Sequence, residues 1–297
     1  AEIAQGHNSA FVDKQNRSFV VYHTRFSNGG EGHQVRVHQL FLNDEGWLMA
    51  APFEFDGETI TDAAIASKAS IADADIAGDY QFMRHQYGQN TKAKAFETPV
   101  NITLNADGTI TGAEKGTWKR TAGTDYIHLT INDVVYRGVL VKQTIDYTNI
   151  PAIAISALSS SSGSVALGQN NFTYQQEVWA VKADAKAAIK YTLSKMTLPF
   201  SDGATLNAAP SLPVQGKMGA NISWKSSDTS ILTDEGKVKG KGKVTMTMTI
   251  SKDEYEYVKD YSLNIDAEAE ETTPVYYPVS AQKNTTSAWW TNFSADY

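Results

Sequence analysis

Hydrophobic and polar residues alternate along most of this chain, which is the pattern of β-strands with one buried face. The clearest alternating stretch is Lys243–Ile250, in which threonines separate the apolar residues Val244, Met246, Met248 and Ile250. One stretch, Glu177–Met196, changes to a helical period, because apolar residues recur there every four positions at Val181, Ala185, Ile189 and Leu193. We therefore predict an all-β protein with one helix, which ends before Pro199.

Residues 1–62 are expected to form antiparallel strands joined by short turns. A hairpin is predicted over Ala10–Phe26 with its turn at Asp13–Arg17, and a further strand over Gln34–Leu42. Apolar residues occur on both faces of these strands, and an isolated three-stranded sheet is only marginally stable. We expect the sheet to pack against protein that lies outside this chain.

Residues 63–76 are small and alanine-rich, and we expect a connector that contains a helical turn. In residues 77–174, short strands alternate with turns at a spacing that is typical of a closed barrel or a sandwich. Two of the predicted strands, Ile153–Leu158 and Ser164–Gly168, are expected to pair around the serine-rich turn Ser159–Gly163.

Residues 175–265 combine the predicted helix with a separate β pattern that resembles a bacterial immunoglobulin-like domain, with Trp224 in its core. Residues 266–297 begin with an acidic stretch, Asp266–Pro274, which we expect to be a solvated linker. The aromatic segment Val275–Tyr297 is then expected to be the truncated start of a further β module.

Charge and composition exclude several classes of function. The net charge of −7 without a basic cluster disfavours nucleic acid and anionic membrane surfaces as partners. No apolar run approaches the roughly 18 residues of a membrane span. The absence of cysteine excludes a disulfide framework, a thiolate zinc site and a cysteine nucleophile.

A series of motifs in the first 62 residues resembles the last blade of glycoside hydrolase family 43, in particular its extracellular endo-α-1,5-L-arabinanases. The motifs occur in the family's order: Gly6-His7-Asn8-Ser9, Val20–Arg25, Gly30–His33, Val35–Gln39 and Gly46-Trp47. Residues 77–174 are similar to the β-barrel that follows the propeller in the same enzymes. The resemblance implies the remnant of a five-bladed β-propeller, then a β-barrel, then the helix and an Ig-like β-sandwich.

The resemblance also implies a calcium ion in the propeller channel, where it contacts one histidine and several waters. His7 is the histidine that matches this position. The same resemblance implies an inverting hydrolase of arabinan or a pectic side-chain polysaccharide, secreted or displayed on the surface of a bacterium. Inverting enzymes use two carboxylates ~6.5–9.5 Å apart. In this family the catalytic Asp and Glu come from earlier blades, so we expect them upstream of Ala1 in a missing N-terminal propeller portion. No signal peptide is visible, and the chain alone is expected to be inactive.

Other interpretations of these residues stay open. A lone histidine beside a glycine is more often a packing or turn residue, and calcium prefers oxygen ligands. The barrel aromatics Trp118, Tyr126, Tyr136 and Tyr147 could stack on sugars, although aromatics on alternating strands are more often core. Two alternative functions are a non-catalytic carbohydrate-binding or cell-surface spacer protein, and an arabinofuranosidase or xylosidase of the same family.

Overall fold

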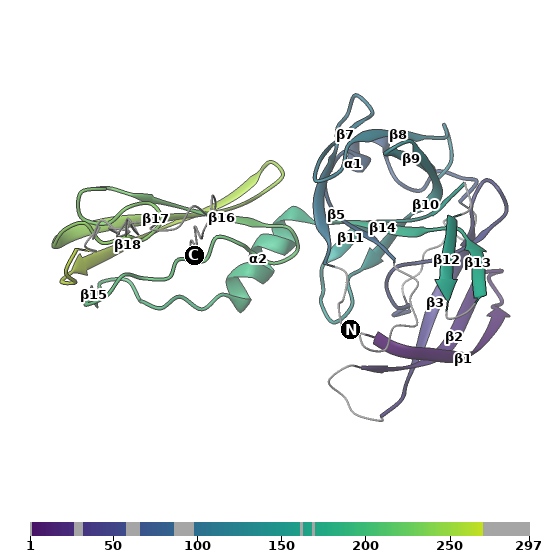
Figure 1. Ribbon diagram of the computed structural model, residues 1–297, viewed down its shortest axis with the longest axis horizontal. Helices are drawn as coiled ribbons and strands as arrows, with labels where there is room; N and C mark the ends of the chain where they lie inside the picture. Colours follow the sequence, from purple (N-terminus) through teal and green to yellow (C-terminus); the bar gives the residue numbers. More distant parts are fainter. Residues whose placement is uncertain are drawn as a thin grey trace, which may run out of the picture.

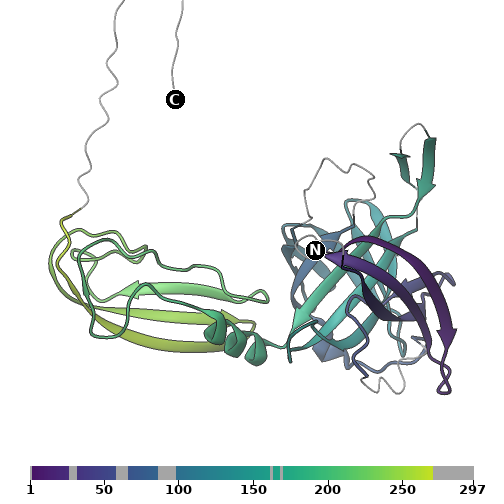
Figure 2. The same cartoon turned by 90° about the horizontal axis from the view of Figure 1, so that it is seen from below.

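The computed structural model describes residues 2–26, 32–57, 66–85, 98–160, 163–167 and 170–269. It consists of a small antiparallel sheet, a closed barrel and an Ig-like unit, in that order along the chain. In Figure 1 the Ig-like unit lies beside the barrel and the first sheet lies below it, and Figure 2 shows the same parts from another side. Among the described residues, no helix is long and apolar enough to cross a membrane.

The first sheet is an antiparallel meander with the order β1-β2-β3-β4. Its strands are β1 (Glu2–Val12), β2 (Ser18–Phe26), β3 (Gln34–Leu42) and β4 (Leu48–Ala50). The predicted hairpin and the strand over Gln34–Leu42 are confirmed, and β4 is an additional strand. The sheet packs against the barrel through Phe41, Met49 and Ala51, which contact Val139 and Val141 of the barrel wall. The expectation that the sheet packs only against protein outside this chain is therefore corrected, because the barrel covers part of the sheet.

The barrel closes in the order β10-β11-β14-β5-β6-β7-β8-β9. Its interior is filled by large side chains such as Tyr80, Phe82, Leu129 and Tyr136, each at most 2% exposed. The short helix α1 (Asp73–Ile76) lies in the predicted connector, and Ile76 packs into the same core. The strands are β5 (Gly78–Arg84), β6 (Val100–Leu104), β7 (Thr109–Gly112), β8 (Gly116–Arg120), β9 (Tyr126–Ile131), β10 (Val134–Thr144), β11 (Pro151–Ser159) and β14 (Glu177–Ala183).

The prediction of a helix over Glu177–Met196 is wrong in its first part. Residues Glu177–Ala183 form β14, which pairs with β11 on one side and β5 on the other, and thereby closes the barrel. Val178 and Ala180 alternate with more exposed neighbours and are buried inside. The helix α2 covers only Ala185–Lys195, and Asp184 caps it by accepting a hydrogen bond from the Ala187 amide at 2.8 Å. Without β14, the edges of β11 and β5 would be unpaired. The barrel thus extends past residue 174.

The predicted pairing of Ile153–Leu158 with Ser164–Gly168 is also wrong. β12 (Gly163–Leu167) pairs with β13 (Asn170–Tyr174) in a separate two-stranded hairpin, which projects from the barrel in Figure 2. Both edges of β11 are already occupied by β10 and β14, so no edge is left for β12.

The Ig-like unit contains one four-stranded sheet, with the order β15-β18-β17-β16. Its core confirms the predicted inward residues Val244, Met246, Met248 and Ile250, and Trp224 is 7% exposed. Helix α2 and the loops that carry Leu212, Leu232 and Val238 form the second layer. The strands are β15 (Thr205–Leu206), β16 (Asn221–Ser226), β17 (Gly242–Lys252) and β18 (Tyr255–Ile265).

The start of the predicted linker is docked on the Ig-like unit rather than solvated. Ala267 is buried in its core, and Lys241 pairs with Asp266 at 3.3 Å and with Glu268 at 2.6 Å. The remainder of Asp266–Pro274 from residue 270, and the whole of Val275–Tyr297, lie outside the described residues.

Candidate functional site

His7 lies on β1, one of the two edge strands of the first sheet, and its side chain is exposed. The strand is irregular at this point, because its register with β2 shifts on both sides of Gly6 and His7 has a φ of 51°. The ring of His7 lies edge-on to that of His23, with centroids 6.1 Å apart, and His23 lies 4.8 Å from His33. Three imidazoles, from β1, from β2 and from the residue before β3, are therefore neighbours.

The donor set around His7 decides whether this region could hold a metal ion. In the described ranges, no group of three or more His, Asp or Glu side chains is arranged to hold one. An exposed single imidazole is compatible with a site whose other ligands are waters. Calcium itself prefers oxygen ligands.

His38 has a structural role, as expected for a mid-strand histidine. It is buried, and its Nδ1 atom lies 2.8 Å from the carbonyl oxygen of Ala51, while its Nε2 atom lies 3.1 Å from the hydroxyl of Tyr22. These bonds join β3 to β2 and to the chain that follows β4.

A second polar cluster joins the first sheet to the β10–β11 turn of the barrel. The buried guanidinium of Arg36 donates hydrogen bonds to the carboxylate of Glu54 and to the hydroxyl of Tyr147. The backbone amide of Glu54 donates to Asp146 Oδ1 at 2.9 Å. Burial raises the pKa of Asp146 above its ordinary value. A carboxyl with a raised pKa is a feature of functional sites, but structural networks produce it too. The contacts of this cluster favour the structural interpretation.

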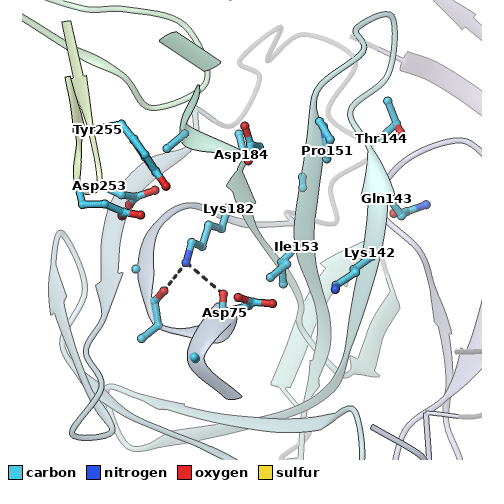
Figure 3. A pocket seen from close by; sticks show the side chains of 17 residues that line it. Asp75, Lys142, Gln143, Thr144, Pro151, Ile153, Lys182, Asp184, Asp253 and Tyr255 are labelled. Carbon is cyan, nitrogen blue, oxygen red and sulfur yellow. Dashed lines mark hydrogen bonds between the residues drawn. The ribbon is translucent and has the colours of Figure 1, made fainter. Parts of the chain in front are cut away.

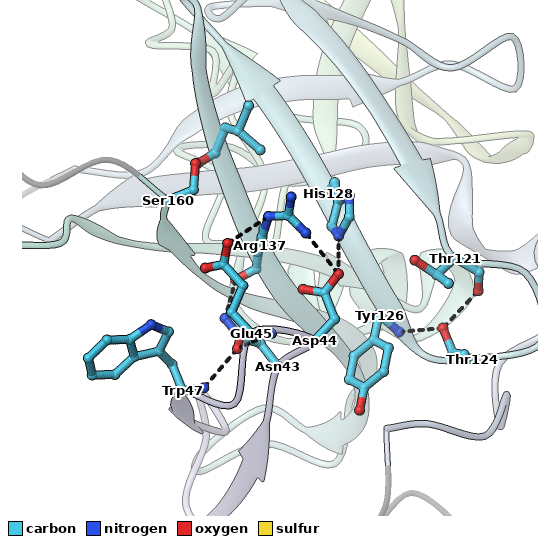
Figure 4. Close-up of polar contacts among 11 residues, drawn as sticks. Asn43, Asp44, Glu45, Trp47, Thr121, Thr124, Tyr126, His128, Arg137 and Ser160 are labelled. Carbon is cyan, nitrogen blue, oxygen red and sulfur yellow. Dashed lines mark hydrogen bonds and ion pairs between the residues drawn. The ribbon is translucent and has the colours of Figure 1, made fainter.

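The turn between β3 and β4 forms the third connection, shown in Figure 4. Asp44 Oδ2 lies 2.6 Å from His128 Nε2 on β9 and 3.1 Å from Arg137 Nη1 on β10. Glu45 lies 3.0 Å from Arg137 Nε, and Asn43 donates to the Arg137 carbonyl oxygen at 3.2 Å. Three consecutive residues of this turn are thus bonded to the barrel wall.

The carboxylates of Asp13 and Asp125 both have structural partners. Asp13 lies in the β1–β2 turn and pairs with Arg17 at 2.7 Å, and Glu31 lies outside the described residues. Asp125, which is fully buried, accepts hydrogen bonds from Arg120 and Ser70 and so fixes the connector to the barrel. These contacts are structural.

The aromatic residues of the barrel mostly confirm the core interpretation. Tyr136 is buried inside, Trp118 packs against the same core and donates to the Asn105 carbonyl oxygen at 2.8 Å, and Tyr126 packs against the first sheet. Tyr147 differs, because it is 78% exposed. Its position in a turn with a φ of 59° removes it from the alternating pattern of the strands.

A carboxylate partner for Arg36 could be expected from the sequence, but its identity as Glu54, the contact with Tyr147, and the contacts of Asp44 with His128 and Arg137 could not. The only local signal was the turn composition of Asn43–Gly46. The partners lie 84 and 93 residues further along the chain, so the pairing depends on the tertiary fold.

Comparison with known protein families identifies two parts of the chain. Residues 52–168 match the C-terminal lipocalin-like domain of glycoside hydrolase family 43, and residues 183–268 match the atrophied bacterial Ig domain. The matches agree with the barrel and with the Ig-like unit.

Two curated relatives are similar in sequence. An extracellular endo-α-(1→5)-L-arabinanase of Thermotoga petrophila is 43% identical over 146 residues, which are 48% of this chain and 28% of the relative. The extracellular endo-α-(1→5)-L-arabinanase 2 of Bacillus subtilis is 37% identical over 164 residues, which are 55% of this chain and 32% of the relative. The chain therefore spans about a third of the length of the curated relatives it matches.

Among solved structures, the endo-1,5-α-L-arabinanase of Thermotoga petrophila in complex with Tris is similar, with a TM-score of 0.49 and 36% identity. The alignment covers 62% of this chain and 37% of that chain.

Proposed function

Because this chain contains the C-terminal domain of glycoside hydrolase family 43 followed by an atrophied bacterial Ig domain, we propose that it is the C-terminal portion of an extracellular bacterial hydrolase of α-1,5-linked arabinan. The observation that carries the proposal is the 43% identity to an extracellular endo-arabinanase. Arabinan or a pectic side chain is then the polysaccharide partner.

We propose further that the β1–β4 sheet is the last blade of a five-bladed propeller. The support is its topology, since propeller blades are four-stranded sheets arranged around a central channel. Phe11, Val12 and Val35 are each at least 47% exposed, and a neighbouring blade would cover apolar residues of this kind. In such a blade β1 would be the innermost strand, which would face the channel with His7.

In this proposal His7 holds the calcium ion of the channel, together with waters. The exposure of His7 on β1 supports this assignment, as described above. A bound calcium ion would supply a fixed positive charge near the scissile bond. The contribution of this chain would be to orient the imidazole, which the bulged backbone at Gly6 and His7 holds on the edge strand.

The catalytic aspartate and glutamate are placed outside this chain in our proposal, in other blades of the propeller. Inversion would require two carboxylates ~6.5–9.5 Å apart, one as general acid and one as the base that activates water. Incubation of linear arabinan with this chain alone should then release no oligosaccharide beyond a heat-killed control. Release above that control would place catalytic groups within the chain.

The role of His7 is tested in the complete protein by His7→Ala. We expect calcium affinity and arabinan hydrolysis to fall together, whereas the matched variant His33→Ala, which removes another exposed imidazole just before β3, should change neither. Hydrolysis and calcium affinity that are unchanged in His7→Ala would remove His7 from the metal site. Cleavage of xylosides or terminal arabinofuranosides in place of linear arabinan would identify a different activity of the same family.

A further inference from the structure

A pocket of about 630 Å3 lies where the barrel meets the Ig-like unit, and Figure 3 shows its lining side chains. The barrel contributes the ends of β10 and β14, the starts of β11 and β5, and part of α1. The Ig-like unit contributes the turn between β17 and β18, with Asp253, Glu254 and Tyr255. Pockets at domain boundaries with volumes of ~300–1,000 Å3 are typical ligand sites.

The pocket forms the mouth of the barrel. The residues Leu140, Ile155, Ala180 and Tyr80 belong to the barrel core, one from each of four adjacent strands. Side chains alternate along a strand, so residues two positions away point to the same side. The residues in those positions line the pocket, and they are Lys142, Ile153, Lys182 and Gly78.

The barrel below this mouth is filled by aromatic and aliphatic side chains. A ligand would therefore be held at the rim and would not enter the interior, unlike the ligands of barrels that enclose a cavity.

The charges around the mouth are mixed. The ammonium group of Lys182 donates to the carbonyl oxygens of Asp75, at 3.1 Å, and Ala77, so it fixes the end of α1. Lys142 projects into the pocket from β10 in Figure 3. Glu254 lies in the β17–β18 turn. The carboxylates that line the pocket are those of Asp75, Asp184, Asp253 and Glu254.

This distribution favours an uncharged ligand with many hydroxyl groups. The four carboxylates would repel an anion, and the two ammonium groups would weaken the attraction of a cation. A hydroxyl group can donate to a carboxylate and accept from an ammonium group, so a polyol satisfies both kinds of side chain. Ile153, Pro151 and the ring of Tyr255 add apolar surface, and Lys186 holds that ring with its Nζ atom 4.4 Å from the ring centroid.

The two walls of the pocket are attached to each other. The amide of Asp79 donates to Asp253 Oδ1 at 3.3 Å, which joins β5 to the β17–β18 turn. The adjacent Lys252 is only 4% exposed. Ala183 and Ala188 share a small apolar core with Ile145, Ile150 and Ala152 of the barrel. The site is therefore formed before a ligand arrives, which reduces the entropic cost of binding.

We propose that this barrel-mouth pocket binds a short uncharged oligosaccharide through Lys142 and Glu254, and that the sugar is a linear arabino-oligosaccharide. The identity of the sugar rests on the proposed function, whereas the charge argument does not.

The test is titration calorimetry of the 297-residue chain with arabinotriose. We expect saturable binding that weakens by about 10-fold or more in Lys142→Ala and in Glu254→Gln, because each variant removes a hydrogen bond to a charged group. The matched controls Lys119→Ala and Glu256→Gln, which change exposed residues outside the pocket, should bind as the original chain does. Circular dichroism spectra and thermal midpoints show whether each variant is folded.

Absence of arabinotriose binding would overturn the proposal, as would binding that both pocket variants leave unchanged. Tighter binding of trigalacturonate than of arabinotriose would overturn the assignment of an uncharged ligand.

The experiments distinguish an error in the proposed barrel-mouth sugar site, called the subsite below, from an error in the proposed function. If the complete protein hydrolyses linear arabinan while the pocket binds no arabinotriose, only the subsite is wrong. If the pocket binds xylotriose through Lys142 and Glu254 but not arabinotriose, the arabinan assignment is wrong.

Discussion

Asp44 Oδ2 lies 2.6 Å from His128 Nε2, so the β3–β4 turn of the first sheet is bonded directly to β9 of the barrel. The carboxylate of Asp44 also contacts Arg137, and the side chains of Asp44 and His128 are only 20% and 12% exposed. The pair is therefore shielded from solvent more than a typical surface ion pair, and it should contribute measurably to stability.

Replacement of this carboxylate is the first prediction. We expect Asp44→Asn to lower the free energy of unfolding of the barrel by about 1–2 kcal/mol, because charge-assisted hydrogen bonds are lost. Urea denaturation measures the change. The control Asp133→Asn removes the same charge from the exposed β9–β10 turn and should have little effect. Equal stability of Asp44→Asn and the original chain would show that the turn does not hold the sheet on the barrel.

Glu114 gives a prediction about how the stability of the barrel changes at low pH. The hydrogen bond from Arg84 lowers the pKa of Glu114, and Asn132 donates a second bond at 3.2 Å. A carboxyl whose folded pKa is lowered adds stability that is complete above its unfolded pKa and is lost as the pH falls through its folded pKa. Glu114→Gln should therefore cost about 1–2 kcal/mol at pH 7 and progressively less below about pH 4.3.

Chemical denaturation of Glu114→Gln across pH 3–7 is the measurement, taken as an approximate range in which carboxyl groups titrate. The variant Glu256→Gln serves as the control, since this exposed carboxylate lies on β18 of the Ig-like unit. A cost that stays constant over the whole range would contradict the assigned pKa direction.

Asp146 should behave in the opposite way. Burial raises its pKa, so its ionisation in the folded protein opposes folding as the pH rises from the unfolded pKa of about 3.9 through the raised folded pKa. Asp146→Asn keeps an oxygen that can accept from the Glu54 amide, which lies 2.9 Å away. We expect the variant to be more stable at pH 7 by up to about 1 kcal/mol. A loss of stability at pH 7 would mean that the ionised carboxylate is needed by Arg36 or His38.

The close contact of β10 with β11 at Gly138 gives a fourth prediction. A Cβ atom there would lie 2.2 Å from the Ser156 carbonyl oxygen and 2.5 Å from the Ala157 Cβ atom. Gly138→Ala should destabilise the barrel by about 1–3 kcal/mol, because overpacking displaces the paired strands. In the matched strand variant Gly6→Ala, the nearest described atom is His23 Nε2 at 3.9 Å, so thermal unfolding should change little.

Trp224 tests the core of the Ig-like unit. Its indole donates to the Pro213 carbonyl oxygen at 2.9 Å, and its ring lies 5.9 Å from the rings of both Phe200 and Tyr261. Trp224→Ala should cost about 3–5 kcal/mol in the unfolding of this unit and leave retention on arabinan unchanged. Trp47→Ala removes a half-exposed indole and should cost less than about 0.5 kcal/mol. Weaker retention of folded Trp224→Ala would indicate a sugar platform.

Local sequence patterns were sufficient to predict the buried residues wherever a strand buries only one of its faces. Lys243–Ile250 and Trp224 were placed correctly because alternation alone determines which side chains enter the core. The segment Glu177–Ala183 was wrongly predicted to be helical. Its alternating pattern is followed directly by the helical period of α2, and the two patterns overlap at Val181. The missing information was the number of strands in the barrel, since the barrel closes only with β14 as its eighth strand.

The polar connections were beyond prediction for a different reason. Arg36, Glu54 and Tyr147 are ordinary surface residue types, and their pairing follows from the way in which the first sheet packs on the barrel. The barrel-mouth pocket could not be predicted for the same reason, because Lys142, Lys182 and Glu254 come to line one pocket only after the barrel closes and the Ig-like unit packs against it.

A single residue, Asp184, separates β14 from α2. The strand that closes the barrel is therefore followed directly by the helix of the Ig-like unit, without a flexible linker between them. Tension applied to the C-terminal half, for example by attachment to a surface, would be transmitted to the seam of the barrel rather than absorbed by a flexible tether. The Ig-like unit should accordingly behave as a rigid arm with a fixed direction.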